Sequence, residues 1–337
     1  MKRTSLLFAA LLFSAYSFAV TIHRVNNLAG AATGVNCHTT INAAVAAAAD
    51  DDIIYIEPST IPYSESAVIT KRLHLIGNGN FLDQNPNTPY DKKNSTTIDV
   101  TFSPGSENGS AAGLNIAGNL YLSTSNILIK KCKVNGYIYS NGANDVIVTQ
   151  CFFNLLGVYS GASPQNWSLT NNIITNGVSG LHNALISNNT FSNVGGDYIT
   201  GGNGLTISNN VFFRKAGTDM PNLAAGNPSS SVNNNLFVLS ASTSPLPANF
   251  NNNVHSNDPD NIFVVGNPSQ KDAEFQLKSG SPAIGIGTGG VDAGAFGGVA
   301  PYTLSTLPNI PIVTSATSSG VGNSTTPLSV TISVRSN

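Results

Sequence analysis

Residues 183–191 and 204–212, which read NALISNNTF and GLTISNNVF, decide the fold because they are two copies of one pattern. Five further segments align with them without gaps, and all seven share one anchor position. The intervals between anchors are 17 to 25 residues, and the anchors are Cys132, Cys151, Asn172, Asn189, Asn210, Asn235 and Asn253. A mean spacing of about 20 residues is too short for a repeat of two helices and fits one turn of a β-solenoid.

Apolar residues alternate with polar ones before each anchor, as Leu205 and Ile207 do, and Phe212 follows two positions after its anchor. A period of two is typical of a strand with one buried face. The phase of the alternation changes at the anchor, so we expect the anchor to lie at a bend that faces inward. Asparagine suits such a bend because it tolerates left-handed backbone angles. Amides stacked about 4.8 Å apart can hydrogen-bond as a ladder.

The repeats ISNNTF and ISNNVF resemble those of the right-handed parallel β-helix superfamily, often called pectin lyase-like. Residues 61–79 look like its opening coils, and residues 275–298 are similar to the SPAI…D-x-GAF ending of many secreted bacterial members. The resemblance covers about residues 40–298. It implies an all-β, right-handed parallel β-helix of about 11–12 coils. It does not imply one activity, because lyases, hydrolases, isomerases and proteins without known reaction share these motifs.

The N-terminus has the pattern of a signal peptide over residues 1–19, with a basic start, an apolar run at 6–13 and small residues before a cleavage site after Ala19. The apolar run is too short to span a bilayer. We therefore expect a mature chain without a membrane span that is secreted, periplasmic or on the cell surface. Residues 20–298 are predicted to form the β-helix domain, and residues 299–337 a linker and β-strand tail.

A short helix is predicted over residues 39–49, with Thr39 or Thr40 as its N-cap. We expect this helix to cap the first coil, whose strand edges would otherwise invite aggregation. The chain has only 9% charged residues and a net charge of −2. This composition gives no basic footprint for nucleic acid. We expect a monomer.

Cys132 and Cys151 occupy the same anchor in successive coils, which places them within reach of a disulfide. The alternative is a pair of buried thiols that replaces two rungs of the asparagine ladder. Parallel stacked side chains point the same way rather than at each other, which favours the thiols.

The motif sets by which related hydrolases, pectinesterases and pectate lyases are recognised are absent, so the catalytic residues are unknown. Lys130, Lys131 and His182 are the candidates that remain for a lyase. Tyr139, Tyr159 and Tyr198 follow their anchors at similar distances, which predicts a stack that could hold sugar rings. Arg214 could add to a positive strip that binds an acidic glycan.

No cofactor is predicted, with Ca²⁺ on Asp258 and Asp260 as the alternative to a simple turn. The sequence favours an exported β-helix protein that binds carbohydrate or associates with a cell surface, with a polysaccharide or cell-surface glycan as its partner. The alternative is a polysaccharide lyase acting on an acidic glycan. Whether the chain is an enzyme is left open.

Overall fold

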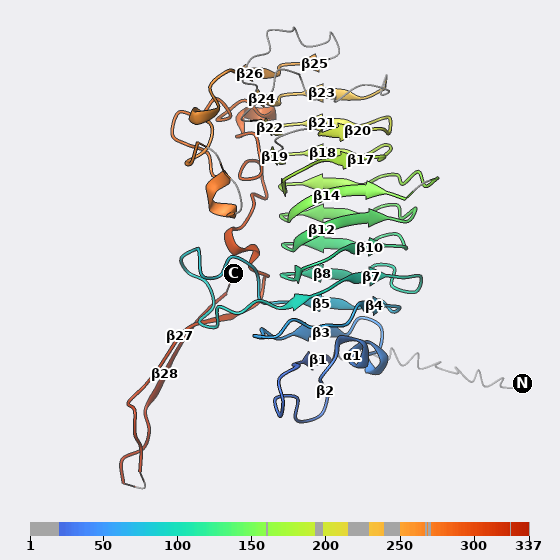
Figure 1. Cartoon of the computed structure of the whole chain (residues 1–337). Helices are drawn as coiled ribbons and strands as arrows, with labels where there is room; N and C mark the ends of the chain where they lie inside the picture. The colour runs from blue at the N-terminus through green and yellow to red at the C-terminus, as the bar shows by residue number, and fades with distance from the viewer. Residues whose placement is uncertain are drawn as a thin grey trace, which may run out of the picture.

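Parallel strands wind into a β-solenoid of about eight turns, which runs from the bottom to the top of Figure 1. The computed structural model describes residues 20–159, 161–192, 198–214, 229–238, 250–266, 268, 271–323 and 325–336. The predicted signal peptide lies outside the described residues. The all-β solenoid is therefore confirmed, but the expected number of 11–12 coils is too high.

One side of the solenoid is a twelve-stranded parallel sheet. Its strands, in spatial order, are β2 (Cys37–His38), β1 (Ile22–Val25), β3 (Ile53–Ile56), β5 (His74–Ile76), β8 (Ser110–Ala112), β11 (Leu128–Lys130), β13 (Ile147–Thr149), β15 (Ser168–Thr170), β18 (Leu185–Ser187), β21 (Thr206–Ser208), β23 (Ser231–Asn233) and β25 (Phe250–Asn251).

The other side is a fourteen-stranded sheet that receives the chain after each anchor. Its main path is β26 (Val254–Ser256), β24 (Leu236–Val238), β22 (Val211–Phe213), β19 (Thr190–Ser192), β16 (Ile173–Ile174), β14 (Phe152–Val158), β12 (Lys133–Ser140), β10 (Leu120–Leu122), β7 (Val100–Phe102) and β4 (Ala67–Ile69). Beside this path lie β6 (Thr96–Thr97), β9 (Asn115–Ile116), β17 (Val178–Ser179) and β20 (Ile199–Thr200).

The twelve strands of the first sheet come close to the expected number of coils. However, β1 and β2 have no counterpart in the second sheet, so the N-terminal coils are incomplete. Residues 77–95 leave the solenoid between β5 and β6. We call residues 77–95 the excursion.

The seven anchors form one continuous column of hydrogen bonds inside the solenoid. The backbone N–H of Asn172 donates to Oδ1 of Asn189 at 3.0 Å, and that of Asn189 donates to Oδ1 of Asn210 at 2.8 Å. The side-chain amides are linked as well, at 2.9 and 3.1 Å. The column continues through Asn235 to Asn253. Each amide thus satisfies buried polar groups that a single coil could not satisfy.

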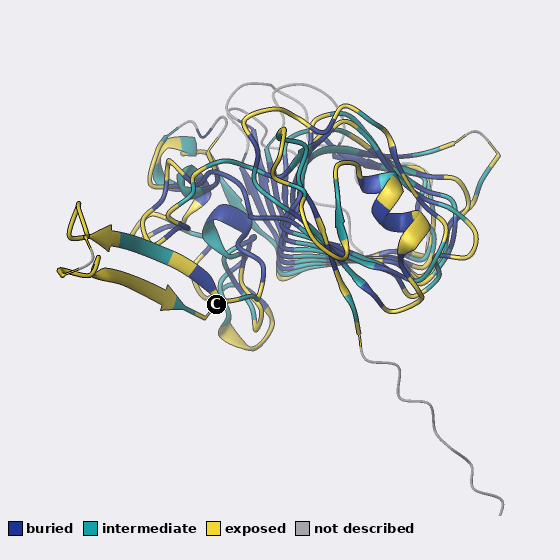
Figure 2. Ribbon diagram, turned by 90° about the horizontal axis from the view of Figure 1, so that it is seen from below, coloured by how far each residue is buried: buried dark blue, intermediate teal, exposed yellow. Residues whose placement is uncertain are grey.

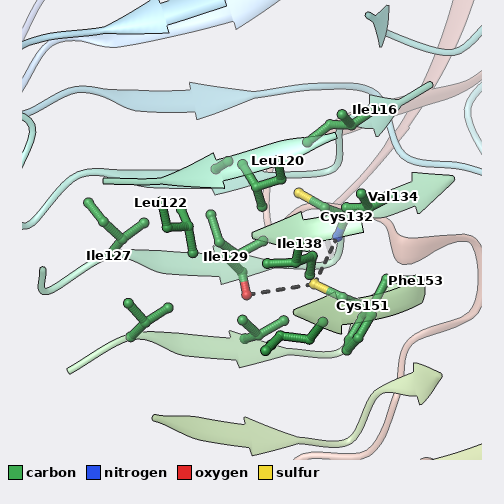
Figure 3. Packing of buried hydrophobic residues seen from close by; sticks show 14 of the residues in the cluster. Ile116, Leu120, Leu122, Ile127, Ile129, Cys132, Val134, Ile138, Cys151 and Phe153 are labelled. Carbon is green, nitrogen blue, oxygen red and sulfur yellow. Dashed lines mark hydrogen bonds between the residues drawn. The ribbon is translucent and has the colours of Figure 1, made fainter. Parts of the chain in front are cut away.

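The two cysteine anchors continue the same column as free thiols (Figure 3). The N–H of Cys132 donates to Sγ of Cys151 at 3.4 Å, and the N–H of Cys151 donates to Oδ1 of Asn172 at 2.9 Å. The Cys151 thiol donates to the carbonyl of Ile129 at 3.6 Å. Burial raises the pKa of the Cys151 thiol. These cysteines therefore act as rungs of the ladder.

Helix α1 (Ile41–Ala47) begins after Thr40, whose hydroxyl accepts the N–H of Ala43 at 3.2 Å. The helix buries Ile41, Ala44 and Val45 in the solenoid core, and Figure 2 shows it at the open N-terminal end. The helix and its N-cap are as predicted, whereas its role as a cap stays a prediction. Two strands, β1 and β2, precede it in the chain.

After the last coil the chain turns back along the outside of the solenoid, as the orange-red trace of Figure 1 shows. We call residues 281–309 the return segment. It contains two short helical turns, η3 (Thr288–Gly290) and η4 (Leu304–Thr306). Two others precede it in the chain, η1 (Pro259–Asn261) and η2 (Asp272–Phe275). Residues 301–311, which were expected to be an extended linker, thus contain a helical turn and several buried side chains.

The residues before six of the seven anchors hold the return segment in place. These residues all have a left-handed backbone, and they include Lys131, Gln150, Asn171, Asn188, Asn209 and Asn234. Asn171 donates to the carbonyls of Ala295 and Gly297 at 3.0 and 2.7 Å. Gln150, one coil earlier, donates to the carbonyl of Pro301 at 2.6 Å. The return segment is therefore bonded to one coil after another.

A second apolar core lies outside the solenoid, between the second sheet and the C-terminal region. Outward-facing side chains of several coils contribute to it, together with buried residues of 262–302. Its buried members are Phe81, Phe152, Ile173, Val211, Phe213, Leu236, Val238, Ile262, Phe263, Phe275, Ala283, Ala293, Ala295 and Tyr302. The C-terminal region thus covers much of the outer face of this sheet.

The chain ends in an antiparallel hairpin of β27 (Ile312–Ser318) and β28 (Val330–Arg335). The sequence predicted one tail strand over residues 328–334, and the structure adds a partner strand to it. Figures 1 and 2 show the hairpin standing away from the solenoid.

Candidate functional site

The three lysine and histidine candidates for catalysis do not come together. Lys130 ends β11 with its side chain on the outer face of the first sheet, and Lys131 follows in the turn toward β12. His182 lies in the turn that leads into β18, at the opposite end of the strands of the first sheet. Its Nδ1 pairs with Oδ1 of Asn203 at 2.9 Å. These positions do not form a common acid–base site.

Lys131 is bound by the return segment instead. Its side chain is buried, and Nζ donates to Oδ1 of Asn309 at 2.6 Å. Burial, followed by the charge of Lys130, lowers the pKa of Lys131 to about 8. The geometry gives Lys131 a structural part in holding the C-terminal region.

Two of the binding candidates are placed differently from the prediction. Tyr198 is fully buried, packs against Phe191 and Phe212 and donates its hydroxyl to the carbonyl of Phe213 at 2.5 Å. Arg214 is buried too, with its guanidinium 5.7 Å from the centre of the Tyr198 ring. Neither side chain can therefore belong to an exposed strip, and the prediction for both was wrong.

Asp258 and Asp260 lie in an exposed turn at η1. Oδ1 of Asp258 accepts the N–H of Asp260 at 3.2 Å, which is an N-cap contact. Over the described ranges, no group of three or more histidine, cysteine, aspartate or glutamate side chains is placed to hold a metal ion. A Ca²⁺ site at this turn stays a prediction.

A cavity of about 380 Å³ lies at the N-terminal end of the solenoid, and Asp50, Asp51, Asp52 and Arg72 contribute to its lining. Its polar groups are paired within the chain. Arg72 forms an ion pair with Asp51 at 2.5 Å, and Asp52 accepts the N–H groups of Thr21 and Ala49. This cavity therefore has the character of a structural junction.

Two of the predicted binding residues, Tyr139 and Tyr159, belong to a cluster of four tyrosines that we call the tyrosine face. It consists of Tyr121 on β10, Tyr137 and Tyr139 on β12, and Tyr159 directly after β14. All four side chains lie on the outer side of the second sheet, because the residues that alternate with them are buried in the core. Tyr137 is 38% and Tyr159 is 46% exposed.

Tyr139 is the centre of this face. Its ring lies 5.6 Å from that of Tyr121, 5.3 Å from that of Tyr137 and 5.0 Å from that of Tyr159, measured between ring centroids. Desolvation raises the pKa of Tyr139, and the three neighbouring phenols raise it further. Gly157 lies opposite Tyr139 in the sheet, and a Cβ there would be in ordinary van der Waals contact with the ring, at 3.6 Å. The cluster thus follows from the register of three coils.

A groove of about 200 Å³ lies near the tyrosine face, mainly on strands β12 and β14. It is lined by Lys133, Asn135 and Asn154 together with Val134, Phe152 and Thr175. A β-bulge between Val134 and Tyr137 separates the groove from the tyrosines along β12. Amide groups and aromatic rings therefore occupy different parts of the outer side of the same sheet.

The sequence did not point to Tyr121 and Tyr137 as members of this face. Tyr121 precedes the first segment of the repeat, although it lies 18 residues before Tyr139, which is one coil. Tyr137 and Tyr139 are two residues apart on one strand, a spacing that puts both on the same face. Both signals were available in the sequence.

Among the residues described, none of the helices has the length and apolar character that crossing a bilayer requires. No protein-family model matches the chain, and no curated protein matches it. The fold and the tyrosine face are therefore the features that bear on function.

Proposed function

We propose that this chain is an exported β-helix protein, similar to the pectin lyase-like superfamily, that binds a polysaccharide or a cell-surface glycan through its tyrosine face. The observation that carries the proposal is the cluster of four tyrosines on the outer side of β10, β12 and β14. Tyrosine offers an apolar ring and a hydroxyl together, and it is enriched at binding surfaces for that reason. A sugar offers the complement, since its C–H groups pack on rings and its hydroxyls form hydrogen bonds.

The arrangement of the rings limits how a sugar can bind. The Tyr121 and Tyr139 rings lie 15° from parallel, so they cover part of each other. The rings of Tyr137 and Tyr159 keep more exposed surface and flank Tyr139 on different sides. We expect these two rings to contact the sugar and Tyr139 to hold them in place.

The lyase alternative has less support. A lyase needs a base close to the reacting proton, and the candidates Lys130, Lys131 and His182 are spread over different turns. Lys131 is moreover buried under the return segment. A lyase would release unsaturated products from uronate polymers, which ultraviolet absorbance detects, and we expect no such release.

Affinity electrophoresis of the mature chain in gels that contain polysaccharides tests the proposal. We expect at least one polysaccharide to retard the wild type, and Tyr159→Ala and Tyr137→Ala to lose most of that retardation. Tyr90→Ala is the matched control, since Tyr90 is 61% exposed but lies on the excursion. Retardation that Tyr159→Ala and Tyr90→Ala share with the wild type would contradict the assignment of the site.

A further inference from the structure

We infer that the tyrosine face selects uncharged polysaccharides and rejects acidic ones, an inference that rests on the proposed function. It concerns the class of glycan, and it follows from the charges around the face rather than from the tyrosines themselves.

The face has little positive charge to offer. Strands β10, β12 and β14 carry one cationic residue between them, Lys133. Its ammonium group lies 4.8 Å from the centre of the Phe81 ring, a cation–π contact with the excursion. Lys133 is half-buried, and burial lowers its pKa although Asp272 opposes the shift. This ammonium group is thus engaged by the excursion, although Lys133 also lines the groove.

Carboxylates instead flank the strand next to the tyrosines. Asp99 directly precedes β7 and Glu107 lies in the turn that follows it, and β7 pairs with β10, which carries Tyr121. Oδ1 of Asp99 accepts the N–H of Asn119 at 2.6 Å, and the amide of Asn119 donates to the hydroxyl of Tyr121 at 3.0 Å. One carboxylate is therefore linked to the face by two hydrogen bonds.

Glu107 is held in place as well. Its carboxylate accepts the hydroxyl of Thr124 and the N–H of Gly105. The hydrogen bond from Thr124, followed by backbone N–H contacts, lowers the pKa of Glu107, so it is ionised at neutral pH. A polyanion laid over β10 would meet this charge and that of Asp99. Exposed charges interact over about 8 Å at physiological ionic strength, so the repulsion should weaken as salt is added.

The polar groups that remain are suited to hydroxyls. Asn135 and Asn154 line the groove beside the tyrosines, and their amides can both donate and accept without charge. Tyr137, Tyr139 and Tyr159 add phenolic hydroxyls of the same kind. A glycan without carboxylates can therefore use these groups without repulsion from Asp99 and Glu107.

Affinity electrophoresis with full-length mature protein tests this inference against matched probes. The uncharged probes are xyloglucan, mixed-linkage β-glucan and galactomannan, and the acidic probes are polygalacturonate and alginate. Each mobility is compared with that in a gel without polysaccharide, at low and at physiological salt. We expect retardation by an uncharged probe that is insensitive to salt, and little or none by the acidic probes.

The double variant Asp99→Asn/Glu107→Gln keeps hydrogen-bond acceptors and removes both charges. We expect it to increase retardation by polygalacturonate several-fold relative to retardation by the uncharged probe. Asp83→Asn is the control, because it removes an exposed charge on the excursion. Far-UV circular dichroism verifies that all variants fold.

The outcomes separate the inference from the proposed function. Binding to acidic probes that equals or exceeds binding to uncharged ones, and that Tyr159→Ala abolishes, would overturn the inference and leave the proposed function intact. The inference would also fail if the double variant behaved like Asp83→Asn. Retardation by none of the probes would overturn both.

Discussion

The asparagine ladder predicts a large loss of stability when one central rung is removed, as in Asn189→Leu. Oδ1 of Asn189 accepts the backbone N–H and the side-chain amide of Asn172, at 3.0 and 2.9 Å. Its Nδ2 donates to the carbonyl of Leu169 at 2.8 Å and to Oδ1 of Asn210 at 3.1 Å. Leucine has a similar size but can make none of these bonds.

The magnitude follows from the groups that lose a partner. The buried N–H of Asn172 is left without its acceptor, which costs about 1–3 kcal/mol, and each further lost bond costs about 1 kcal/mol. The apolar surface that leucine buries returns about 2 kcal/mol. We therefore expect Asn189→Leu to lower the free energy of unfolding by about 3 kcal/mol.

Urea denaturation followed by far-UV circular dichroism measures this loss. Asn253→Leu is the matched comparison, because Asn253 makes the same bond to Asn235 but is only half-buried at the last rung, where water can replace it. We expect a loss there of about 1 kcal/mol or less. Equal losses at both positions, or no loss at Asn189, would refute the reasoning that the buried column stabilises the solenoid.

Three more predictions concern the turns and the return segment. Asn171→Gly keeps the left-handed backbone and removes two hydrogen bonds to the return segment. Limited proteolysis should therefore cut residues 281–309 sooner than in the wild type. An unchanged cleavage rate would contradict the role of Asn171 in holding the return segment. Gly202→Ala should lower the melting temperature far more than Gly142→Ala does. Both glycines have a positive φ, but only a Cβ at Gly202 would collide with the neighbouring backbone. Equal shifts in the melting temperature would exclude the collision as the cause. Lys131 has a pKa of about 8 in the folded chain, below its ordinary value of 10.5. Between these pH values the unfolded chain binds more protons than the folded one, so the free energy of unfolding should rise with pH across this window. The urea midpoint of Lys131→Met should rise less than that of the wild type, and an identical rise would refute the assignment.

The solenoid could be predicted from the sequence because its signals are local. Each coil repeats the alternation of Leu205 and Ile207 and carries a bend residue such as Asn210, and the stack follows when like residues lie over one another. The number of coils was overestimated, and the structure has about eight turns because the N-terminal coils are incomplete. The first strands, β1 and β2, lie outside the repeat and left no pattern.

The return segment could not be predicted, for a physical reason. Asn171 and Gln150 bind main-chain carbonyls of residues 295–301. Every residue has such a carbonyl, so the sequence of the acceptor carries no signal. Asparagines with a left-handed backbone also occur at turns without binding another segment. Because they are frequent in this sequence, it did not reveal that some of them bind the return segment.

The candidate site was predicted in part. Tyr139 and Tyr159 follow their anchors by seven and eight residues, and the bulge in β12 compensates for this difference, so both rings lie on the outer side of the sheet. Tyr198 precedes β20 in a turn of different length, and its ring points into the core. Spacing along the chain therefore predicts side-chain direction only where the coils have the same shape.

The way in which the outer core is covered has a consequence for assembly. Coils that contact only their neighbours can form one after another as the polypeptide emerges. Phe152, Ile173 and Val211 nevertheless face outward until residues 262–302 arrive to cover them. A chain whose coils have formed before residues 262–302 are in place would expose a row of hydrophobic side chains. We expect the chain to be most prone to aggregate, or to need a chaperone, at this stage of folding.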